Sequence, residues 1–346
     1  MTCAIHIFLF KRNRFEDNIG GLMSISRKTI GVVLCTYNGE KFLSQQLESI
    51  MCQTRPPARI LILDDGSSDR TCSIAHSFAE NDSRIHLIQN ETNLGFIHNF
   101  EKGMSLCETD LIALCDQDDV WFPNKLERLA AELEAHPGSG MAYCNAELIT
   151  ADGTPTGHIF FNGQNRFSED QSYARSVLLE RRFSIPGNFI LLESELKDIV
   201  LPLQYTRTHA HDALICLNAF FLFKPRYIPE PLTFYRLHSN QASGAFGGAY
   251  AFFLKGTQSE FKKKKWYDLK RLSRNLKRAI LSPFKHSEKI RERRERAYNG
   301  ASDMLVIIEQ LMNQRRQLKL PELSSQEHHF IQKMKSEWLA LLSSKI

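Results

Sequence analysis

The sequence predicts an α/β protein with a Rossmann-like, doubly wound and mostly parallel sheet, followed by a helical and basic C-terminal region. Three observations support this fold class. Between residues 29 and 115 short apolar runs alternate with segments of helical periodicity, polar clusters follow several of these runs, and basic clusters gather beyond residue 250. Strands joined by helices pair in parallel through right-handed crossovers, so helices are expected on both faces of the sheet.

The first part of the chain alternates regularly. Short, continuous aliphatic runs predict buried strands at residues 29–35, 58–63, 84–89 and 110–115. The helix after the first strand is predicted from apolar positions that share one face, namely Leu43, Leu47, Ile50 and Met51. Two further helices are predicted at residues 70–80 and 96–106.

After residue 116 the pattern is less regular. Asn124 is predicted to cap a helix with Glu127 as its capping-box partner, and Pro137 with Gly138 is predicted to end it. The remaining apolar runs predict a helix near residues 212–223 and strands at residues 141–150, 186–193 and 226–238.

Composition narrows the class of protein. The 346 residues are 42% hydrophobic and 24% charged, which predicts a folded chain with a substantial core. The net charge of +5 is modest and no nucleic-acid-binding module is recognised, so no nucleic-acid partner is expected. Eight cysteines without CxxC spacing, and no apolar run long enough for a membrane span, predict a cytoplasmic protein.

Two basic clusters lie late in the chain, at residues 262–265 and 291–296. Such clusters form solvated helix faces or bind an anionic surface. Aromatic residues interleave with the lysines near the first cluster, which is consistent with peripheral contact at the inner face of an anionic cell membrane.

The stretch CDQDDVWFPNKLE brings three aspartates to the end of the strand predicted at residues 110–115. Closely spaced carboxylates repel one another, so they form either an acidic surface turn or a cation site. Polar clusters also follow the first and second strands, and all are expected at one edge of the sheet: Thr36, Tyr37, Asn38, Asp64 and Asp65. Mg²⁺ and Mn²⁺ prefer carboxylate and phosphate oxygens, so the predicted ligand is a metal diphosphate.

A calcium loop of the EF-hand type is the alternative for this stretch. Asp116, Asp118 and Glu127 stand at loop positions one, three and twelve. However, Val120 stands at position five and Trp121 at position six, where the sharp turn requires glycine. The spacing therefore disfavours calcium.

Six segments, in order, resemble the inverting family 2 nucleotide-sugar glycosyltransferases, and the chain looks like their bacterial rhamnosyltransferase-like branch. They are VVLCTYNGEKFLSQQLESIMCQT, ILILDDGSSDRT, NLGF, CDQDDVWFPNKL, HD and YRLHSN. The resemblance covers residues 30–243 and implies a GT-A fold. The expected organisation is an N-terminal extension (1–28), a GT-A domain (29–250) and a helical, basic region (251–346).

The resemblance implies roles for residues at the donor end. Thr36 and Tyr37, with Asn38 beside them, are expected to contact the nucleotide, and Asp65 to accept from the base N3 hydrogen. Asp116 and Asp118 match the outer members of the family's DxD motif, which places Asp116 near the ribose. A divalent cation, Mn²⁺ or Mg²⁺, is expected on Asp118, with His238 reaching the metal or the diphosphate.

The catalytic base is expected at Asp212, which matches the family's base and begins an apolar helix whose dipole would keep it ionised. Its alternative role is that of a helix N-cap. Many relatives carry Glu-Asp where this chain has His211-Asp212, so His211 is expected either to touch the acceptor or to support Asp212. Gly187 is expected to allow close backbone approach in the acceptor wall. Trp121 is either a sugar-stacking platform or a core residue.

The predicted function is inverting transfer of a sugar, with rhamnose as one candidate, from a UDP- or dTDP-sugar to a hydroxyl of a glycan or lipid-linked acceptor. A nucleotidyltransferase is one alternative, but the first strand is followed by TYNGEKF rather than by a Gly-rich phosphate loop. A non-catalytic binding protein is another, although the metal aspartates and the base are present. A binuclear hydrolase of the HxHxD type is disfavoured, because in HAHDA the aspartate directly follows His211.

Overall fold

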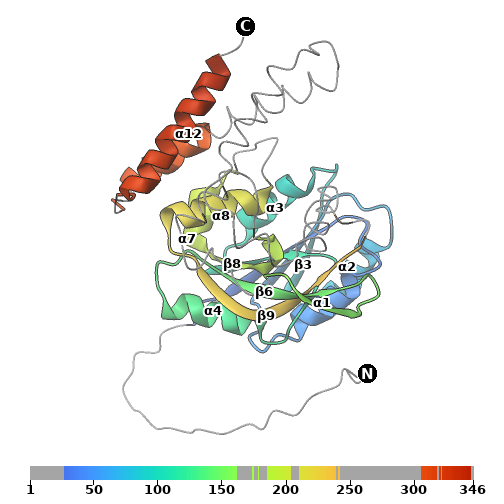
Figure 1. The fold of residues 1–346 in the computed structure, drawn as a ribbon. Coiled ribbons are helices and arrows are strands. Elements are labelled where there is room, and N and C mark those ends of the chain that lie inside the picture. The colour runs from blue at the N-terminus through green and yellow to red at the C-terminus, as the bar shows by residue number, and fades with distance from the viewer. Residues whose placement is uncertain are drawn as a thin grey trace, which may run out of the picture.

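In the computed structural model the chain folds around one mixed sheet with helices on both faces (Figure 1). The structure describes residues 27–161, 174, 178, 185–203, 210–238, 241, 305–317, 319–320 and 322–343. Within these residues the strand order is β3-β2-β1-β4-β8-β6-β9-β5, and β7 pairs with β6. The predicted α/β, GT-A-type architecture is confirmed.

The first half of the sheet is parallel, as predicted. Its strands are β1 (Ile30–Thr36), β2 (Arg59–Asp64), β3 (Ile85–Gln89) and β4 (Leu111–Asp116). Continuous aliphatic runs form β1, β2 and β4 because these strands are buried on both faces, whereas the edge strand β3 exposes His86 and Gln89. The crossovers contain α1 (Leu43–Met51), α2 (Thr71–Asn81) and α3 (Phe96–Leu106). Parallel pairing brings the C-terminal ends of β1, β2 and β4 to one edge.

The second half of the sheet mixes directions. β8 (Ile190–Glu193) pairs antiparallel with both β4 and β6 (Met141–Ile149), and β6 pairs parallel with the long β9 (Arg226–Arg236). The remaining elements are β5 (Val120–Trp121), α4 (Lys125–Ala135), β7 (Pro155–Ile159), η1 (Gly187–Phe189), α7 (Ser194–Val200) and α8 (His211–Leu222). α3, α7 and α8 lie on one face of the sheet, and α1, α2 and α4 lie on the other (Figure 1).

Two local predictions in this half were wrong. The strand predicted at residues 186–193 begins with the 3₁₀ turn η1, and the helix α7 that follows was not predicted. The capping box is also absent: Asn124 makes no side-chain cap bond, and its φ of −97° and ψ of 6° are not those of an extended capping residue. Glu127 instead accepts a hydrogen bond of 2.7 Å from the Thr54 hydroxyl.

The core depends on close approach of α3 to the sheet at Gly103. A Cβ atom there would lie 2.4 Å from Val33 Cγ1 and 3.0 Å from Leu63 Cδ2. We therefore expect Gly103→Val to lower the free energy of unfolding by about 1–3 kcal/mol, because the added side chain overpacks this contact. Chemical denaturation measures this loss, and Ser105→Val, on the exposed side of α3, is the matched control. Equal losses in both variants would show that β-branching in the helix, not the tight contact, sets the effect.

The C-terminal part of the described chain is helical, at residues 305–317 and in α12 (Ser325–Ser343). Ile308, Leu311 and Met334 are buried and join the same apolar cluster as the sheet residues. The predicted boundary near residue 250, the basic clusters and nearly all of the N-terminal extension lie outside the described residues. Among the helices that are described, none combines the length and apolarity needed to cross a bilayer.

Candidate active site

The ends of β1 and β2 are joined by hydrogen bonds of Asp64. The Thr36 hydroxyl donates to Asp64 Oδ1 at 3.0 Å, and the backbone N–H of Ser67 donates to Oδ2 at 2.9 Å. Burial raises the pKa of Asp64, but the hydrogen bonds from Ser67, Cys72 and Thr36 together outweigh this and leave that pKa below its ordinary value. Thr36 is buried, with its hydroxyl bonded to Asp64 and its carbonyl accepting from the Asp65 N–H at 2.9 Å, and its contact with the nucleotide stays a prediction. The hydrogen bonds between Thr36, Asp64 and Ser67 therefore stabilise the ends of β1 and β2 at this edge of the sheet.

Asp65 holds the loop that precedes α3. One carboxylate oxygen accepts from the Asn90 amide and the Leu94 N–H, and the other accepts from the Gly95 N–H at 2.8 Å. Asp65 is 3% exposed, and its Oδ2 accepts one of these three bonds, which leaves acceptor capacity on that atom. The base-reading role of Asp65 stays a prediction, and the geometry adds that Asp65 orders one wall of the pocket.

Tyr37 and Asn38 follow β1 at the exposed rim of this edge. The Tyr37 side chain is 51% exposed, and its backbone N–H and carbonyl both bond to the Gln117 side-chain amide, at 2.9 and 3.0 Å. Asn38 accepts from the Ser68 N–H at 2.9 Å. Gln117, between the two predicted DxD aspartates, was missed by sequence reasoning because the middle position of the motif was treated as a spacer. It ties the β1 loop to the β4 loop.

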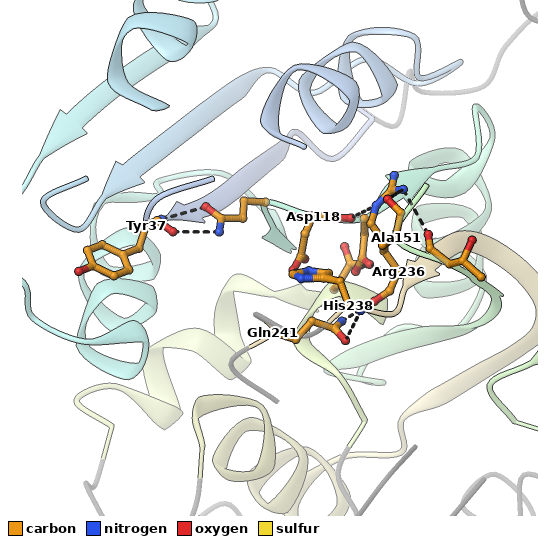
Figure 2. A network of polar contacts seen from close by, with 10 residues as sticks. Tyr37, Asp118, Ala151, Arg236, His238 and Gln241 are labelled. Carbon is orange, nitrogen blue, oxygen red and sulfur yellow. Dashed lines mark hydrogen bonds and ion pairs between the residues drawn. The ribbon is translucent and has the colours of Figure 1, made fainter. Parts of the chain in front are cut away.

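The acidic centre lies at the end of β4, where Asp116, Asp118 and Asp212 influence one another. Burial, then the carboxylates of Asp118 and Asp212, raise the pKa of Asp116 to about 7. Asp118 Oδ2 accepts a hydrogen bond of 2.8 Å from His238 Nε2, and Figure 2 shows these two side chains meeting away from the Tyr37 ring. The structure thus brings together four predicted site residues that are up to 122 positions apart in the sequence printed above.

The donor set at this centre fits a hard divalent cation. A positive charge placed between the carboxylates of Asp116 and Asp118 would relieve their mutual repulsion, and the His238 imidazole beside them is a further candidate ligand. Mg²⁺ commonly takes one or two protein carboxylates, while phosphate and water complete its coordination shell. Among the described residues no three His, Cys, Asp or Glu side chains already form a complete ligand cluster. Asp118 and His238, with Asp116 beside them, are therefore the residues that would hold Mn²⁺ or Mg²⁺.

Arg236, at the end of β9, donates hydrogen bonds to the loop that contains Asp118 and Asp119. It is 2% exposed, its backbone N–H donates to Asp119 Oδ1 at 2.8 Å, and its Nε donates to the Asp118 carbonyl at 2.7 Å (Figure 2). Its guanidinium also lies 4.7 Å from the centroid of the Phe42 ring, which in turn packs against the His238 ring at 5.0 Å. The buried guanidinium of Arg236 thus holds the Asp118 backbone directly and the His238 ring through Phe42.

Asp212 lies in the first turn of α8, partly exposed to solvent. The capping position belongs to Ala210, and Asp212 Oδ1 accepts from the N–H of the next residue, Ala213, at 2.6 Å. The N-cap alternative is therefore wrong. A carboxylate in the first turn gains from the helix dipole, which favours its ionised form. Its electrostatic effect on Asp116 places it at the acidic centre.

His211 is a packing residue inside the protein. It is 6% exposed and stacks on Phe100, with ring centroids 4.0 Å apart, while Phe96 meets it edge-on at 6.0 Å. Within the described chain neither ring nitrogen has a hydrogen-bond partner. This burial favours the supporting role of His211 over direct contact with the acceptor. His209, its neighbour in HAHDA, lies outside the described residues.

Burial of His211 predicts a pH-dependent stability. Burial lowers the pKa of His211 to about 3, so between about pH 6.5 and pH 3 the unfolded chain binds a proton that the folded chain does not. Stability is therefore lost on acidification across this window, at a rate of up to about 1.4 kcal/mol per pH unit. Urea unfolding at pH 7.5, 6.5 and 5.5 measures the slope. We expect His211→Phe to flatten it, whereas the surface control His86→Phe keeps it; identical slopes in all three proteins would refute this assignment.

Trp121 and Gly187 also lie inside rather than on the surface. Trp121 is 3% exposed, its indole N–H donates to Asn188 Oδ1 at 2.6 Å, and the Lys125 ammonium lies 4.1 Å from its ring centroid. The sugar-platform alternative for Trp121 is therefore wrong, and the core alternative holds. The close approach expected at Gly187 exists, but towards His211: a Cβ atom there would lie 2.9 Å from His211 Nε2.

A comparison with known protein families finds a match within the chain. Residues 31–199 match the family described as Glycosyl transferase family 2. An uncharacterized glycosyltransferase of Haemophilus influenzae is 27% identical over 229 residues, which are 63% of this chain and 68% of that protein. The putative glycosyltransferase EpsH of Bacillus subtilis is 29% identical over 60% of this chain and 61% of its own length.

Two further similarities concern narrower points. The putative teichuronic acid biosynthesis glycosyltransferase TuaG of Bacillus subtilis is 28% identical over 36% of this chain and 50% of its own length. The crystal structure of Staphylococcus aureus TarS 1-349 in complex with UDP-GlcNAc superimposes with a TM-score of 0.53 at 16% identity, covering 91% of each chain. At that identity the superposition supports the fold alone.

Proposed function

Because residues 31–199 match the family described as Glycosyl transferase family 2, we propose that the protein transfers a sugar from a UDP- or dTDP-sugar, with inversion, to a hydroxyl of a glycan or lipid-linked acceptor. The observation that carries the proposal is the hydrogen bond of 2.8 Å between His238 Nε2 and Asp118 at the end of β4, beside Asp116, whose pKa is raised by burial and by the charges of Asp118 and Asp212. Two of these aspartates fit a metal diphosphate, and the third fits a base.

Surface-polysaccharide synthesis is the proposed setting. The similarity to a protein named for teichuronic acid biosynthesis supports it. Rhamnose belongs to the donors to be tested, because the sequence resembles the rhamnosyltransferase-like branch. A lipid-linked acceptor at the inner membrane face agrees with the basic clusters at residues 262–265 and 291–296.

In the proposed reaction, the nucleoside is bound by residues that follow β1 and β2, namely Thr36, Tyr37, Asn38 and Asp65. Asp116 lies near the ribose, and Asp118 faces the diphosphate. The ionised Asp212 accepts the proton of the acceptor hydroxyl while the hydroxyl oxygen attacks the anomeric carbon from the face opposite the diphosphate. The bond between the anomeric carbon and the phosphate oxygen breaks, and its electron pair leaves with the nucleoside diphosphate. One displacement inverts the anomeric configuration, and one carboxylate suffices as base.

A divalent cation held by Asp118 and His238 would supply Lewis-acid stabilisation of the charge that develops on the leaving diphosphate. The chain's own residues prepare its position, because Arg236 fixes the Asp118 backbone and the Phe42 ring packs against His238. No protein acid is required for departure, which agrees with the single candidate base.

Thermal unfolding against a panel of UDP-, dTDP-, GDP- and CMP-sugars, with Mn²⁺, with Mg²⁺ and with EDTA, tests the proposed donor class. We expect one pyrimidine diphosphate sugar to raise the melting temperature only when metal is present, since a ligand that binds the folded state alone stabilises it. Stabilisation by GDP- or CMP-sugars alone, or equal stabilisation in EDTA, would contradict the proposal. Asp198→Asn, at an exposed aspartate on α7, serves as the control variant.

A further inference from the structure

Asn188, the middle residue of η1, joins four separate parts of the fold. Its side-chain N–H groups donate to Asp119 Oδ2 at 2.6 Å and to the Thr233 hydroxyl at 3.3 Å, and its side-chain oxygen accepts from the Trp121 indole at 2.6 Å. Its backbone carbonyl accepts from the Lys125 ammonium. Asn188 is buried, and every hydrogen-bonding capacity of its amide nitrogen is used, so the orientation of the amide is determined by its partners.

The Asn188 bonds reach the proposed metal site through one residue. Asp119, which accepts from Asn188, also accepts from the backbone N–H of Arg236, and Arg236 in turn donates to the carbonyl of Asp118. Asp119 is buried between these two donors, directly after Asp118 in the chain. A shift of Asn188 therefore moves the backbone that carries the Asp118 carboxylate.

Gly187, the residue before Asn188, meets the base helix. Any side chain at Gly187 would press on His211, because a Cβ atom would lie 2.9 Å from His211 Nε2. The imidazole has no room to retreat, since its other side stacks on Phe100 at 4.0 Å. His211 is the first residue of α8 and Asp212 the second, so pressure on His211 displaces the base.

We propose that η1 is the element that positions the two halves of the active site relative to each other, with Asn188 positioning Asp118 through Asp119 and Gly187 positioning Asp212 through His211. This inference rests on the proposed function. Neither residue touches a substrate in this scheme; both act through a neighbour. Substitutions of the two residues should therefore change different quantities. Asn188 should affect binding of the metal diphosphate, and Gly187 should affect the rate of the chemical step.

For Asn188 the test is binding of UDP measured by calorimetry with Mn²⁺ and with EDTA. We expect Asn188→Ala to weaken Mn²⁺-dependent UDP binding by about 10- to 100-fold, the usual effect of removing a residue that orients a metal ligand, and to leave binding in EDTA unchanged. The variant also removes the acceptor of the Trp121 indole. Its emission spectrum should therefore differ from wild type in the component that Trp121→Phe abolishes.

For Gly187 the test separates turnover from binding. We expect Gly187→Ala to keep the Mn²⁺-dependent affinity for UDP and to lower the rate of donor turnover by at least about tenfold, since a displacement of the base by about an ångström suffices for that loss. Gly187→Ser adds a similar Cβ atom and should repeat the pattern.

Ile190→Ala supplies the matched control, because the buried Ile190 side chain follows the turn on β8 and makes none of these hydrogen bonds. Its backbone N–H, which donates to the Gly187 carbonyl, is kept in the variant. It lowers stability without touching the active site, so its UDP affinity and turnover should match wild type at temperatures well below unfolding. If the Asn188 and Gly187 variants behave like Ile190→Ala, the positioning role is refuted while the proposed function stands. If wild type itself shows no Mn²⁺-dependent UDP binding, the proposed function fails and this inference fails with it.

Discussion

Asp212→Asn is expected to lower donor turnover by about 100- to 10,000-fold, the range that a positioned general base contributes. The asparagine keeps the size of the side chain and its hydrogen bond from the Ala213 N–H, so the start of α8 should remain intact. It cannot accept a proton from the acceptor hydroxyl. The measurement is the rate of nucleoside diphosphate release with saturating donor and metal.

Binding distinguishes loss of the base from loss of the site. Mn²⁺-dependent UDP affinity should not fall in Asp212→Asn, because removing one carboxylate charge near Asp116 reduces the repulsion that a dianionic ligand meets. Asp198→Asn is the matched control, since Asp198 is an exposed aspartate on the neighbouring helix α7. Wild-type turnover in Asp212→Asn would refute the base assignment and return Asp212 to a structural role.

Asp118→Asn is the second variant with a large expected effect. Asp118 is the proposed carboxylate ligand of the metal, and its loss should weaken Mn²⁺-dependent UDP binding by at least about 100-fold, the upper end of what removing a supporting residue costs. Binding in EDTA should not weaken, because the variant removes a negative charge near the diphosphate. Calorimetric titration with and without Mn²⁺ measures both values.

The partner of Asp118 provides an internal comparison. His238→Gln removes the imidazole that donates to Asp118 and should reduce the Mn²⁺-dependent affinity in the same direction. Asp198→Asn, on the exposed side of α7, should leave it unchanged. Undiminished Mn²⁺ dependence in Asp118→Asn would exclude this aspartate as the ligand.

The parallel half of the fold could be predicted from the sequence because its central strands β1, β2 and β4 are buried on both faces. Such strands are continuous aliphatic runs, and the intervening helices carry an apolar face, so strand and helix differ clearly in pattern. Parallel pairing then determines where the strands end, and this is why residues as distant as Asp65 and Asp118 could be assigned to one edge before any coordinates were considered.

The supporting residues could not be predicted, because their partners are distant in sequence. The bond between Asn188 and Asp119 spans 69 residues, and that between Arg236 and Asp119 spans 117. A buried polar residue has no periodic signature, and its cost of burial becomes acceptable only through partners that tertiary structure supplies. For the same reason the sequence could not distinguish a sugar-stacking role of Trp121 from a core role. The hydrogen bond from its indole to the buried Asn188 amide identifies it as a core residue.

Glu127 illustrates a different limit. Its spacing from Asn124 is that of a capping box, yet the Thr54 hydroxyl lies 2.7 Å from its carboxylate. Local hydrogen-bonding patterns compete with tertiary partners, and sequence spacing records only the local candidate. The prediction that polar residues gather at one edge of the sheet was confirmed, because it rested on strand ends rather than on side-chain pairs.

The most direct test of a single displacement with Asp212 as base is the anomeric configuration of the sugar released when wild-type enzyme slowly transfers it from the donor to water. Proton NMR during the first turnovers, before mutarotation, identifies the anomer. The proposed mechanism predicts that the first anomer formed is opposite to that of the donor, and that its formation requires Mn²⁺ or Mg²⁺ and is lost in Asp212→Asn. Initial appearance of the donor's own anomer would contradict inversion.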